Sequence, residues 1–165
     1  MRYAQIRKMD ITNGEGIGVS LFTQGCPFHC EGCFNPETWD FQGGKEWTPE
    51  TQQYFLSLIT PSYIKRVSFL GGEPLAEPNL DAILQLVQDI KKKRPDIKVW
   101  FYSGNIYEHM TGKQKNILSY CDVLVDGPFV YKLRDITLPF RGSSNQRIID
   151  IQKSLKQNKT ILWEC

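Results

Sequence analysis

The fold is decided by the stretch IGVSLFTQGCPFHCEGC, residues 17–33. Its opening residues are apolar or small and predict a buried strand over 17–22, which ends at the turn residue Gly25. Three cysteines follow within eight residues, Cys26, Cys30 and Cys33. The sequence therefore predicts a strand that carries a C-x3-C-x2-C loop at its carboxyl end.

Three thiolates at this spacing are soft ligands that suit zinc or an iron–sulfur cluster. In an iron–sulfur cube, three cysteines leave one iron without a protein ligand, and an open iron can bind substrate, as the open position of a catalytic zinc does. The alternative is a zinc site completed by His29, Cys121, Cys165 or another distant side chain. The chain has no second C-x2-C or H-x3-H pair of the kind that zinc modules use, and five cysteines are an odd count for a disulfide framework.

Length and composition bound the fold and the class of partner. A chain of 165 residues that is 41% hydrophobic can bury one core, so we expect a single domain over residues 1–165. The net charge of +2 gives no electrostatic case for nucleic acid or membrane as the main partner. No stretch approaches the roughly 18 apolar residues of a membrane span, and the first residues lack the apolar core of a signal peptide. We therefore expect a cytoplasmic protein, whose thiols stay reduced.

Strand-like and helix-like segments alternate along the rest of the chain. Apolar residues fall at helical spacing over 80–94, a helix is expected to begin at Pro49 behind a Thr48 cap, and a weaker helix lies near 113–120. Further strands are expected over 66–70, 98–102 and 122–125, and the apolar run 161–163 is a candidate for a last one. This alternation predicts an α/β fold with a mainly parallel sheet. Its functional loops follow the carboxyl ends of the strands, where the cysteines, Gly71, Gly72, Glu73, Ser103 and Asp126 all lie.

Five motifs together resemble one family. They are Gly25-Cys26-Pro27, Cys33-Phe34-Asn35-Pro36-Glu37-Thr38-Trp39, Gly71-Gly72-Glu73-Pro74-Leu75, Asp126-Gly127-Pro128-Phe129 and Arg141-Gly142-Ser143-Ser144-Asn145-Gln146-Arg147. The cysteine loop is similar to that of the radical S-adenosylmethionine superfamily. The combination resembles, within it, the activating proteins of anaerobic ribonucleoside-triphosphate reductases, and the likeness spans about residues 9–151.

The resemblance implies an activity, its cofactors and its partners. Cys26, Cys30 and Cys33 would hold a [4Fe–4S] cluster with one open iron, where one-electron reduction cleaves S-adenosylmethionine to methionine and a 5′-deoxyadenosyl radical. That radical would take a hydrogen from a glycine of the anaerobic reductase, and the electron would come from a donor such as a flavodoxin-type protein. A closed (β/α) barrel takes about 250 residues, so we expect a partial, open barrel whose open side is the docking face for the reductase.

The resemblance also gives the strand-end residues cofactor roles, each with a plainer alternative. Gly71 and Gly72 would let backbone approach the methionine amino group, with Glu73 adding a carboxylate or fixing the loop, although Gly-Gly-Glu-Pro is also an ordinary turn sequence. Ser103 and Asp126 would contact the cofactor, Asp126 through the ribose hydroxyls, unless Asp126 merely starts a turn. Residues 141–147 would hold the cofactor carboxylate or the glycine-bearing segment of the reductase, or form a plain polar loop.

Two positions depart from the family pattern. Residue 32 is Gly where many radical S-adenosylmethionine enzymes carry an aromatic that packs on adenine, so the sequence does not identify the residue that stacks there. The segment Gly14-Glu15-Gly16-Ile17-Gly18 resembles the Gly-Pro-Gly-x-Arg pattern of glycyl-radical activases, with Glu for Pro and Gly for Arg. Whatever that arginine does must here be done elsewhere, or not at all.

Two other functions stay open on the sequence alone. One is a radical S-adenosylmethionine enzyme that acts on another glycyl-radical protein or on a small molecule. The motifs at 126–129 and 141–147 argue against it, because they match the reductase activases in particular. The other is a zinc-binding interaction module without catalysis.

Overall fold

The computed structural model describes all 165 residues and contains one seven-stranded sheet in the order β3-β1-β2-β4-β5-β6-β7. The four central strands are parallel, whereas β1, β3 and β7 run antiparallel to their neighbours. The sheet does not close on itself, so the expected α/β fold of a partial barrel is confirmed. The strands are β1 (Arg2–Asp10), β2 (Gly18–Thr23), β3 (Lys45–Glu46), β4 (Arg66–Gly71), β5 (Lys98–Ser103), β6 (Val123–Asp126) and β7 (Arg147–Asp150).

Four α-helices connect or follow the strands: α1 (Pro49–Leu58), α2 (Leu80–Lys93), α3 (Gly112–Leu118) and α4 (Ile151–Gln157). The first begins as the sequence predicts, because the Thr48 side chain accepts a hydrogen bond from Thr51 N and Pro49 occupies the first turn. A capping box of Thr111 and Gln114 starts α3. None of these helices combines the length and the apolar character that a bilayer span requires.

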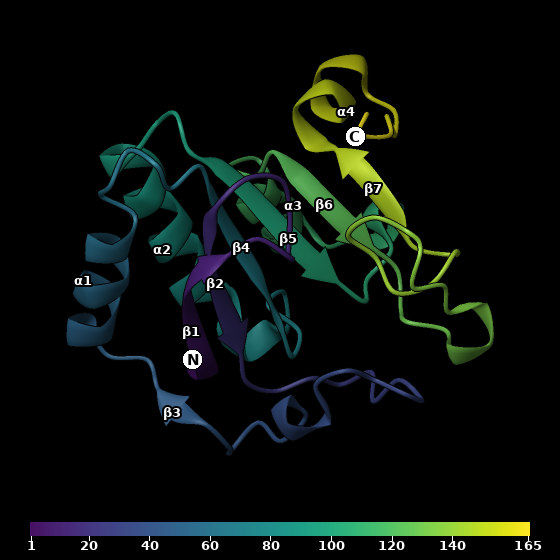
Figure 1. Cartoon of the computed structure of the whole chain (residues 1–165), viewed down its shortest axis with the longest axis horizontal. Helices are drawn as coiled ribbons and strands as arrows, with labels where there is room; N and C mark the ends of the chain where they lie inside the picture. The colour runs from purple at the N-terminus through teal and green to yellow at the C-terminus, as the bar shows by residue number, and fades with distance from the viewer.

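The two faces of the sheet carry different cores. A cluster of 24 buried hydrophobic residues fills the space between the sheet and the helices, with Phe69 and Phe101 stacked at its centre. The other, concave face has a smaller apolar cluster of Trp100, Val123, Val125 and Ile148. Figure 1 shows α1 and α2 along one side of the sheet, and shows the loops after β2 and β6 reaching out on the other. The single sheet takes strands from both ends of the chain, and the single domain over residues 1–165 stays a prediction.

The edges of the sheet differ from the sequence-based expectation. The sequence did not predict β1, β3, β7 or α4. The prediction of a strand over 161–163 is wrong, because Leu162 makes only an isolated bridge to Ile149. Two backbone hydrogen bonds flank this bridge, from Asp150 N to Ile161 O and from Trp163 N to Ile148 O, and hold the end of the chain along β7.

Candidate functional site

The carboxyl ends of the parallel strands surround a cavity of about 540 Å³. This volume lies in the range of small-molecule and cofactor sites. Asp126 does not line the cavity, although its neighbours Val125 and Gly127 do. The structure brings the other predicted site residues together around the cavity: Cys26, Cys30, Cys33, Gly71, Gly72, Glu73 and Ser103.

The start of the cysteine loop is held by backbone contacts to the segment around the 3-10 helix η1 (Pro36–Thr38). Gly25 N donates to Thr38 O at 2.7 Å, and Cys26 N donates to Trp39 O at 3.1 Å. Gly25 has a φ of +97°, and a Cβ there would run into the Phe41 ring, so the position requires glycine. The three cysteines of the loop are free thiols, half-buried beside the cavity.

These three thiols suit a cluster better than a single metal ion. No group of three His, Cys, Asp or Glu side chains converges closely enough to hold one ion. Of the proposed fourth zinc ligands, Cys121 lies in the helix-side core and donates to Val99 O, whereas Cys165 is exposed. A cube instead spreads its thiolates over separate irons. Three separate thiols in one loop at the edge of a cavity therefore fit the three-cysteine cluster.

The protein alone does not favour the thiolate form of Cys26. Burial raises the pKa of this thiol, and the nearby Glu73 and Cys30 raise it further. Hydrogen bonds from the backbone of Phe28 and His29 lower the pKa but do not cancel the rise. A bound metal is the group that drives deprotonation of such a cysteine.

The segment Gly71-Gly72-Glu73 is joined to the segment that leads into the cysteine loop. Gly72 N donates to Thr23 O and Glu73 N donates to Gly25 O, both at 2.8 Å. Gly71 has a φ of +98°, and a Cβ on Gly72 would lie 2.5 Å from Gly25 O, so both positions require glycine. The Gly72 carbonyl accepts no hydrogen bond from the chain, although this residue lines the cavity. The two loops therefore form one unit with a free acceptor at its edge.

The Glu73 carboxyl group ties its own loop to the loop after β5. Only 2% of the residue is exposed. Its Oε1 accepts from Leu75 N at 3.0 Å and from the Ser103 hydroxyl at 2.9 Å, and its Oε2 accepts from Gly104 N at 2.8 Å. Burial raises the pKa of Glu73 to about 7, and these hydrogen bonds oppose the rise. The geometry therefore gives Glu73 the role of fixing the loops, with Ser103 as its partner.

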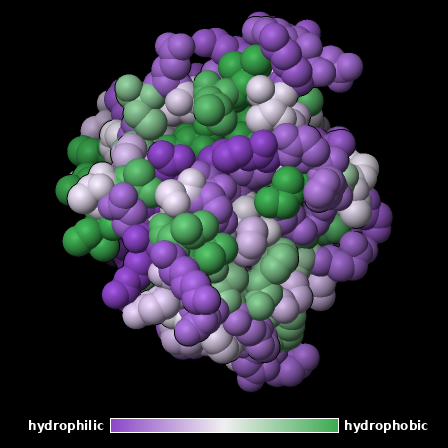
Figure 2. All heavy atoms as spheres, turned by 90° about the vertical axis from the view of Figure 1, so that its right-hand side faces the viewer, coloured by the Kyte–Doolittle hydropathy of each residue, from purple (hydrophilic) through white to green (hydrophobic).

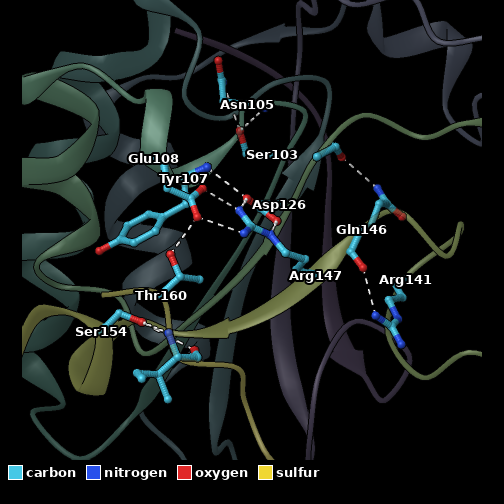
Figure 3. A network of polar contacts seen from close by, with 12 residues as sticks. Ser103, Asn105, Tyr107, Glu108, Asp126, Arg141, Gln146, Arg147, Ser154 and Thr160 are labelled. Atoms are coloured by element: carbon cyan, nitrogen blue, oxygen red, sulfur yellow. Dashed lines mark hydrogen bonds and ion pairs between the residues drawn. The ribbon is translucent and has the colours of Figure 1, made fainter. Parts of the chain in front are cut away.

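Asp126 is committed to an ion-pair network beside the cavity (Figure 3). Its carboxylate accepts from Tyr107 N at 2.9 Å and from Arg147 Nε at 3.0 Å, and it forms a further ion pair with Arg147 Nη2. Arg147 also binds Glu108 at 2.9 and 2.7 Å, and Thr160 donates to Glu108. Glu108 and then Asp126 raise the pKa of Arg147, while Arg147 and Thr160 lower the pKa of Glu108 to about 2. The ribose role of Asp126 stays a prediction, since both carboxylate oxygens have partners within the chain.

The motifs at 126–129 and 141–147 form a single structural unit, which we call the clamp (residues 126–130 and 141–147). Gln146 accepts from Gly142 N and Ser143 N, and its Nε2 donates to Gly127 O at 3.0 Å. Asn145 donates to Pro128 O at 2.8 Å. These bonds explain why two motifs far apart in the sequence occur together.

The clamp packs on the cysteine loop. Phe129 lies against Phe34, with ring centroids 5.2 Å apart, and a Cβ on Gly142 would lie 3.0 Å from both rings. Beyond the clamp, the ring of Tyr131 occupies the space into which a side chain on residue 32 would project. Gly32 also has a φ of +72°. Glycine at residue 32 therefore has a structural reason, since an aromatic there would displace Tyr131.

Several cavity residues escaped sequence reasoning. Arg7 of β1 lines the cavity from the side opposite Arg141, which the sequence already placed among the candidate cofactor residues. Phe28 also lines it and packs on Gly104, whose Cβ would lie 2.7 Å from the ring. No signal in the sequence identified Arg7 and Phe28, because their place at the cavity depends on how segments distant in the chain meet.

Comparisons with known proteins agree with this geometry. The family model of a 4Fe–4S single cluster domain matches residues 12–149. The chain is 39% identical over 150 residues to the anaerobic ribonucleoside-triphosphate reductase-activating protein of Vibrio cholerae, an alignment that covers 90% of this chain and 97% of that protein. The protein of the same name from Haemophilus influenzae is 35% identical, with coverage of 90% and 97%. That of Enterobacteria phage T4 is 37% identical, with coverage of 90% and 93%.

Proposed function

The chain belongs to the family of anaerobic ribonucleoside-triphosphate reductase-activating proteins, and on that premise we propose that it installs a glycyl radical on an anaerobic ribonucleoside-triphosphate reductase. The observation that carries the proposal is the cavity at the strand ends. Three free cysteines of one loop line it, and the Gly71-Gly72-Glu73 backbone is bonded to the segment that leads into that loop.

Cys26, Cys30 and Cys33 would hold three irons of a [4Fe–4S] cluster and leave the fourth without a protein ligand. When bound, the cluster and S-adenosylmethionine supply the radical chemistry: reductive cleavage yields a 5′-deoxyadenosyl radical that takes a hydrogen atom from the glycine. The residues of the chain bind and orient these groups and exclude water from them.

The cavity offers complementary groups for the methionine end of the cofactor. The free carbonyl of Gly72 suits the amino group, which needs a hydrogen-bond acceptor. Arg141 lines the same cavity, forms no ion pair within the chain and is held by a bond from its Nη1 to Gln146 O at 2.9 Å. A guanidinium without a carboxylate partner suits the cofactor carboxylate. Glu73 and Ser103 would act behind these groups by fixing the loops.

The mouth of the cavity suits a protein substrate. Figure 2 looks onto the side where the loops after β2 and β6 end, and apolar patches alternate there with polar ones. Phe34 and Ile136 both line the cavity, and both are well exposed, at 71% and 96%. Exposed apolar side chains at the rim of a site mark an interaction surface. We therefore place the docking face for the reductase at this rim.

Three finer points belong to the same proposal. The electron would come from a flavodoxin-type protein, the chain would work in the cytoplasm, where thiol ligands stay reduced, and residues 1–165 would act as one domain. Another glycyl-radical protein or a small molecule is the alternative substrate. The exposed rim and the clamp, which is built from the motifs particular to reductase activases, favour the reductase.

The test is release of 5′-deoxyadenosine from S-adenosylmethionine by anaerobically reconstituted, chemically reduced protein, with and without the reductase. Wild type is expected to release it and to generate a glycyl radical signal in the reductase by electron paramagnetic resonance. Cys30→Ala is expected to abolish both, whereas Cys121→Ala, which changes a core thiol, is expected to retain both. Release without any radical on the reductase would point to another substrate, and a colourless zinc-loaded protein without release would leave the interaction module.

A further inference from the structure

Arg66 is a fully buried charged residue on the concave face of the sheet. It begins β4, and its exposed fraction is 0%. The guanidinium donates to the carbonyl oxygens of Asp10, Glu15 and Gly16, and also to the Ser68 hydroxyl. Ser68 in turn donates to Asn13 O at 2.6 Å. One side chain therefore holds both ends of the connection between β1 and β2.

The backbone partner of Arg66 in the neighbouring strand is Gly18. The two residues are in register in the parallel pair β2–β4. A Cβ on Gly18 would lie 2.7 Å from Arg66 Cζ and 2.9 Å from Nη1. The guanidinium thus occupies the space into which a side chain on residue 18 would project.

Residue 18 is also the position where this chain has Gly in place of the arginine of the Gly-Pro-Gly-x-Arg pattern. Gly18 has no positive φ, so its dihedral angles suit an arginine, but a Cβ there would also lie 2.8 Å from the Arg66 carbonyl oxygen, so the two strands must shift slightly to admit the side chain. We propose that Arg66, on the neighbouring strand β4, takes the place of this arginine, and that it acts as a positioning residue for the 11–17 loop at the cavity.

The chemistry of the contacts explains why an arginine is needed. The acceptors are three backbone carbonyls and a hydroxyl that lie in different directions around the guanidinium. A planar fork with five donors can reach them together, whereas the point charge of a lysine cannot. Burial lowers the pKa of Arg66 and the nearby Asp10 partly offsets this, so the carbonyl dipoles and Asp10 together stabilise the buried cation.

The held loop reaches the cofactor cavity. Thr12 and Asn13 both line it. Asp10 fixes both residues: its carboxylate accepts from Thr12 N at 2.8 Å and from the Asn13 amide, and also from the Ser20 hydroxyl. Loss of the guanidinium would remove its bonds to Asp10 O and to the Ser68 hydroxyl, which donates to Asn13 O, and would so loosen the loop that places these two side chains.

The experiment is an exchange of the two residues. Four reconstituted proteins are compared: wild type, Arg66→Gly, Gly18→Arg and the double variant Gly18→Arg/Arg66→Gly. Gly112→Arg is the matched control for an added arginine, because nothing lies within 4 Å of a Cβ at that position. The two readouts are the thermal midpoint and the KM for S-adenosylmethionine in the chemically reduced protein without reductase.

Arg66→Gly removes the donor from four acceptors, of which Asp10 O and the Ser68 hydroxyl are buried, and Gly18→Arg forces two guanidinium groups into one space. Each single variant is therefore expected to lose about 10 °C in thermal midpoint, and the double variant to regain more than half of that loss. The KM is expected to rise about tenfold in Arg66→Gly and to return to within about threefold of wild type in the double variant. Gly112→Arg is expected to match wild type in both readouts.

Three results would overturn the inference. An Arg66→Gly protein as stable as wild type, or losses that simply add in the double variant, would show that Arg66 does not take the place of a residue-18 arginine. Recovery of the midpoint without recovery of the KM would show a purely structural residue. The KM readout rests on the proposed cofactor chemistry, but the thermal readout needs neither cofactor nor reductase, so failure of the inference and of the proposed function are distinguishable.

Discussion

Asp126→Asn separates a structural role of this carboxylate from a ribose contact. The side chain is 1% exposed and accepts three hydrogen bonds, one from Tyr107 N and two from Arg147. An asparagine keeps one acceptor oxygen but turns an amide N–H₂ group toward donors. Because Oδ2 accepts two of the three bonds, at least one bond is lost. The bonds that remain no longer involve a carboxylate, and Arg147 keeps only Glu108 as a charged partner.

The expected loss of stability follows from these contacts. A hydrogen bond to a charged group contributes about 1.5–3 kcal/mol, and because the Arg147 side chain is 33% exposed we discount each to about 1 kcal/mol. With one to three bonds lost or weakened, the variant should lose about 1–3 kcal/mol, which lowers the thermal midpoint of a chain this long by about 2–12 °C. Glu108→Gln is the matched control: it changes the other partner of the same arginine, but at an exposed site, and should lose less than about 1 kcal/mol.

The assay pairs thermal unfolding of the reconstituted protein with the KM for S-adenosylmethionine in the deoxyadenosine assay. Because Asp126 does not line the cavity, the KM of Asp126→Asn should stay within about threefold of wild type. A midpoint equal to that of wild type, together with a KM raised tenfold or more, would refute the reasoning. That result would make the ribose contact the main role of Asp126.

Three further predictions follow from single positions. The folded protein holds the pKa of Glu73 at about 7, above the unfolded value of about 4.5, so the folded state binds more protons between these values and its stability falls as pH rises through that window. The fall in the free energy of unfolding amounts to about 3 kcal/mol. Urea unfolding of the cluster-free protein at several pH values should show this fall in wild type and not in Glu73→Gln; the same dependence on pH in both proteins would count against it. Gly72→Ala should lower the iron content of reconstituted protein by more than about half, because its Cβ would press on Gly25 O, whereas Gly112→Ala should not; full iron loading of Gly72→Ala would disprove this. Asn158→Gly should raise the thermal midpoint by about 1–3 °C, because residue 158 ends α4 with a φ of +50°, and a lower midpoint would contradict that account.

The centre of the fold could be predicted from the sequence, whereas its edges could not. Strands β2, β4, β5 and β6 are apolar runs that end at turn residues, so periodicity and punctuation identify them. Strand β1 lacks a clean alternation because irregularities interrupt its pairing with β2, between Tyr3 and Gln5 and between Arg7 and Asp10. Strand β7 is four residues long and mostly buried on both faces, so no period of two appears. Helix α4 did have signals, an Asp150 cap and an αL Asn158, but it is only seven residues long.

The candidate site divides in the same way. The cysteines and Gly71-Gly72-Glu73 follow strands directly, so their place in the fold was readable from order alone. The role of Glu73 as a tie between loops was one of two alternatives, and only contacts with residues about 30 positions away favour it. The burial of Arg66 was not predicted, since an arginine at the start of a strand is expected to reach solvent. Its burial depends on two glycines, Gly14 and Gly18, that leave room for the side chain.

The construction of the cavity explains how a short chain can present a cluster to a protein substrate. Each wall is a loop that has little apolar core of its own and is fixed by a neighbour: the cysteine loop by Gly72 and Glu73 on one side and by the clamp, through Phe34, on the other. Every one of these supports comes from within the sheet or from an adjacent loop, so no further strands are needed to close a barrel around the site. The side opposite the helices therefore stays open, with Arg7 and Arg141 on its two edges. A glycine within a folded partner can reach a cluster only through such an opening, so the incomplete barrel is a requirement of the proposed reaction.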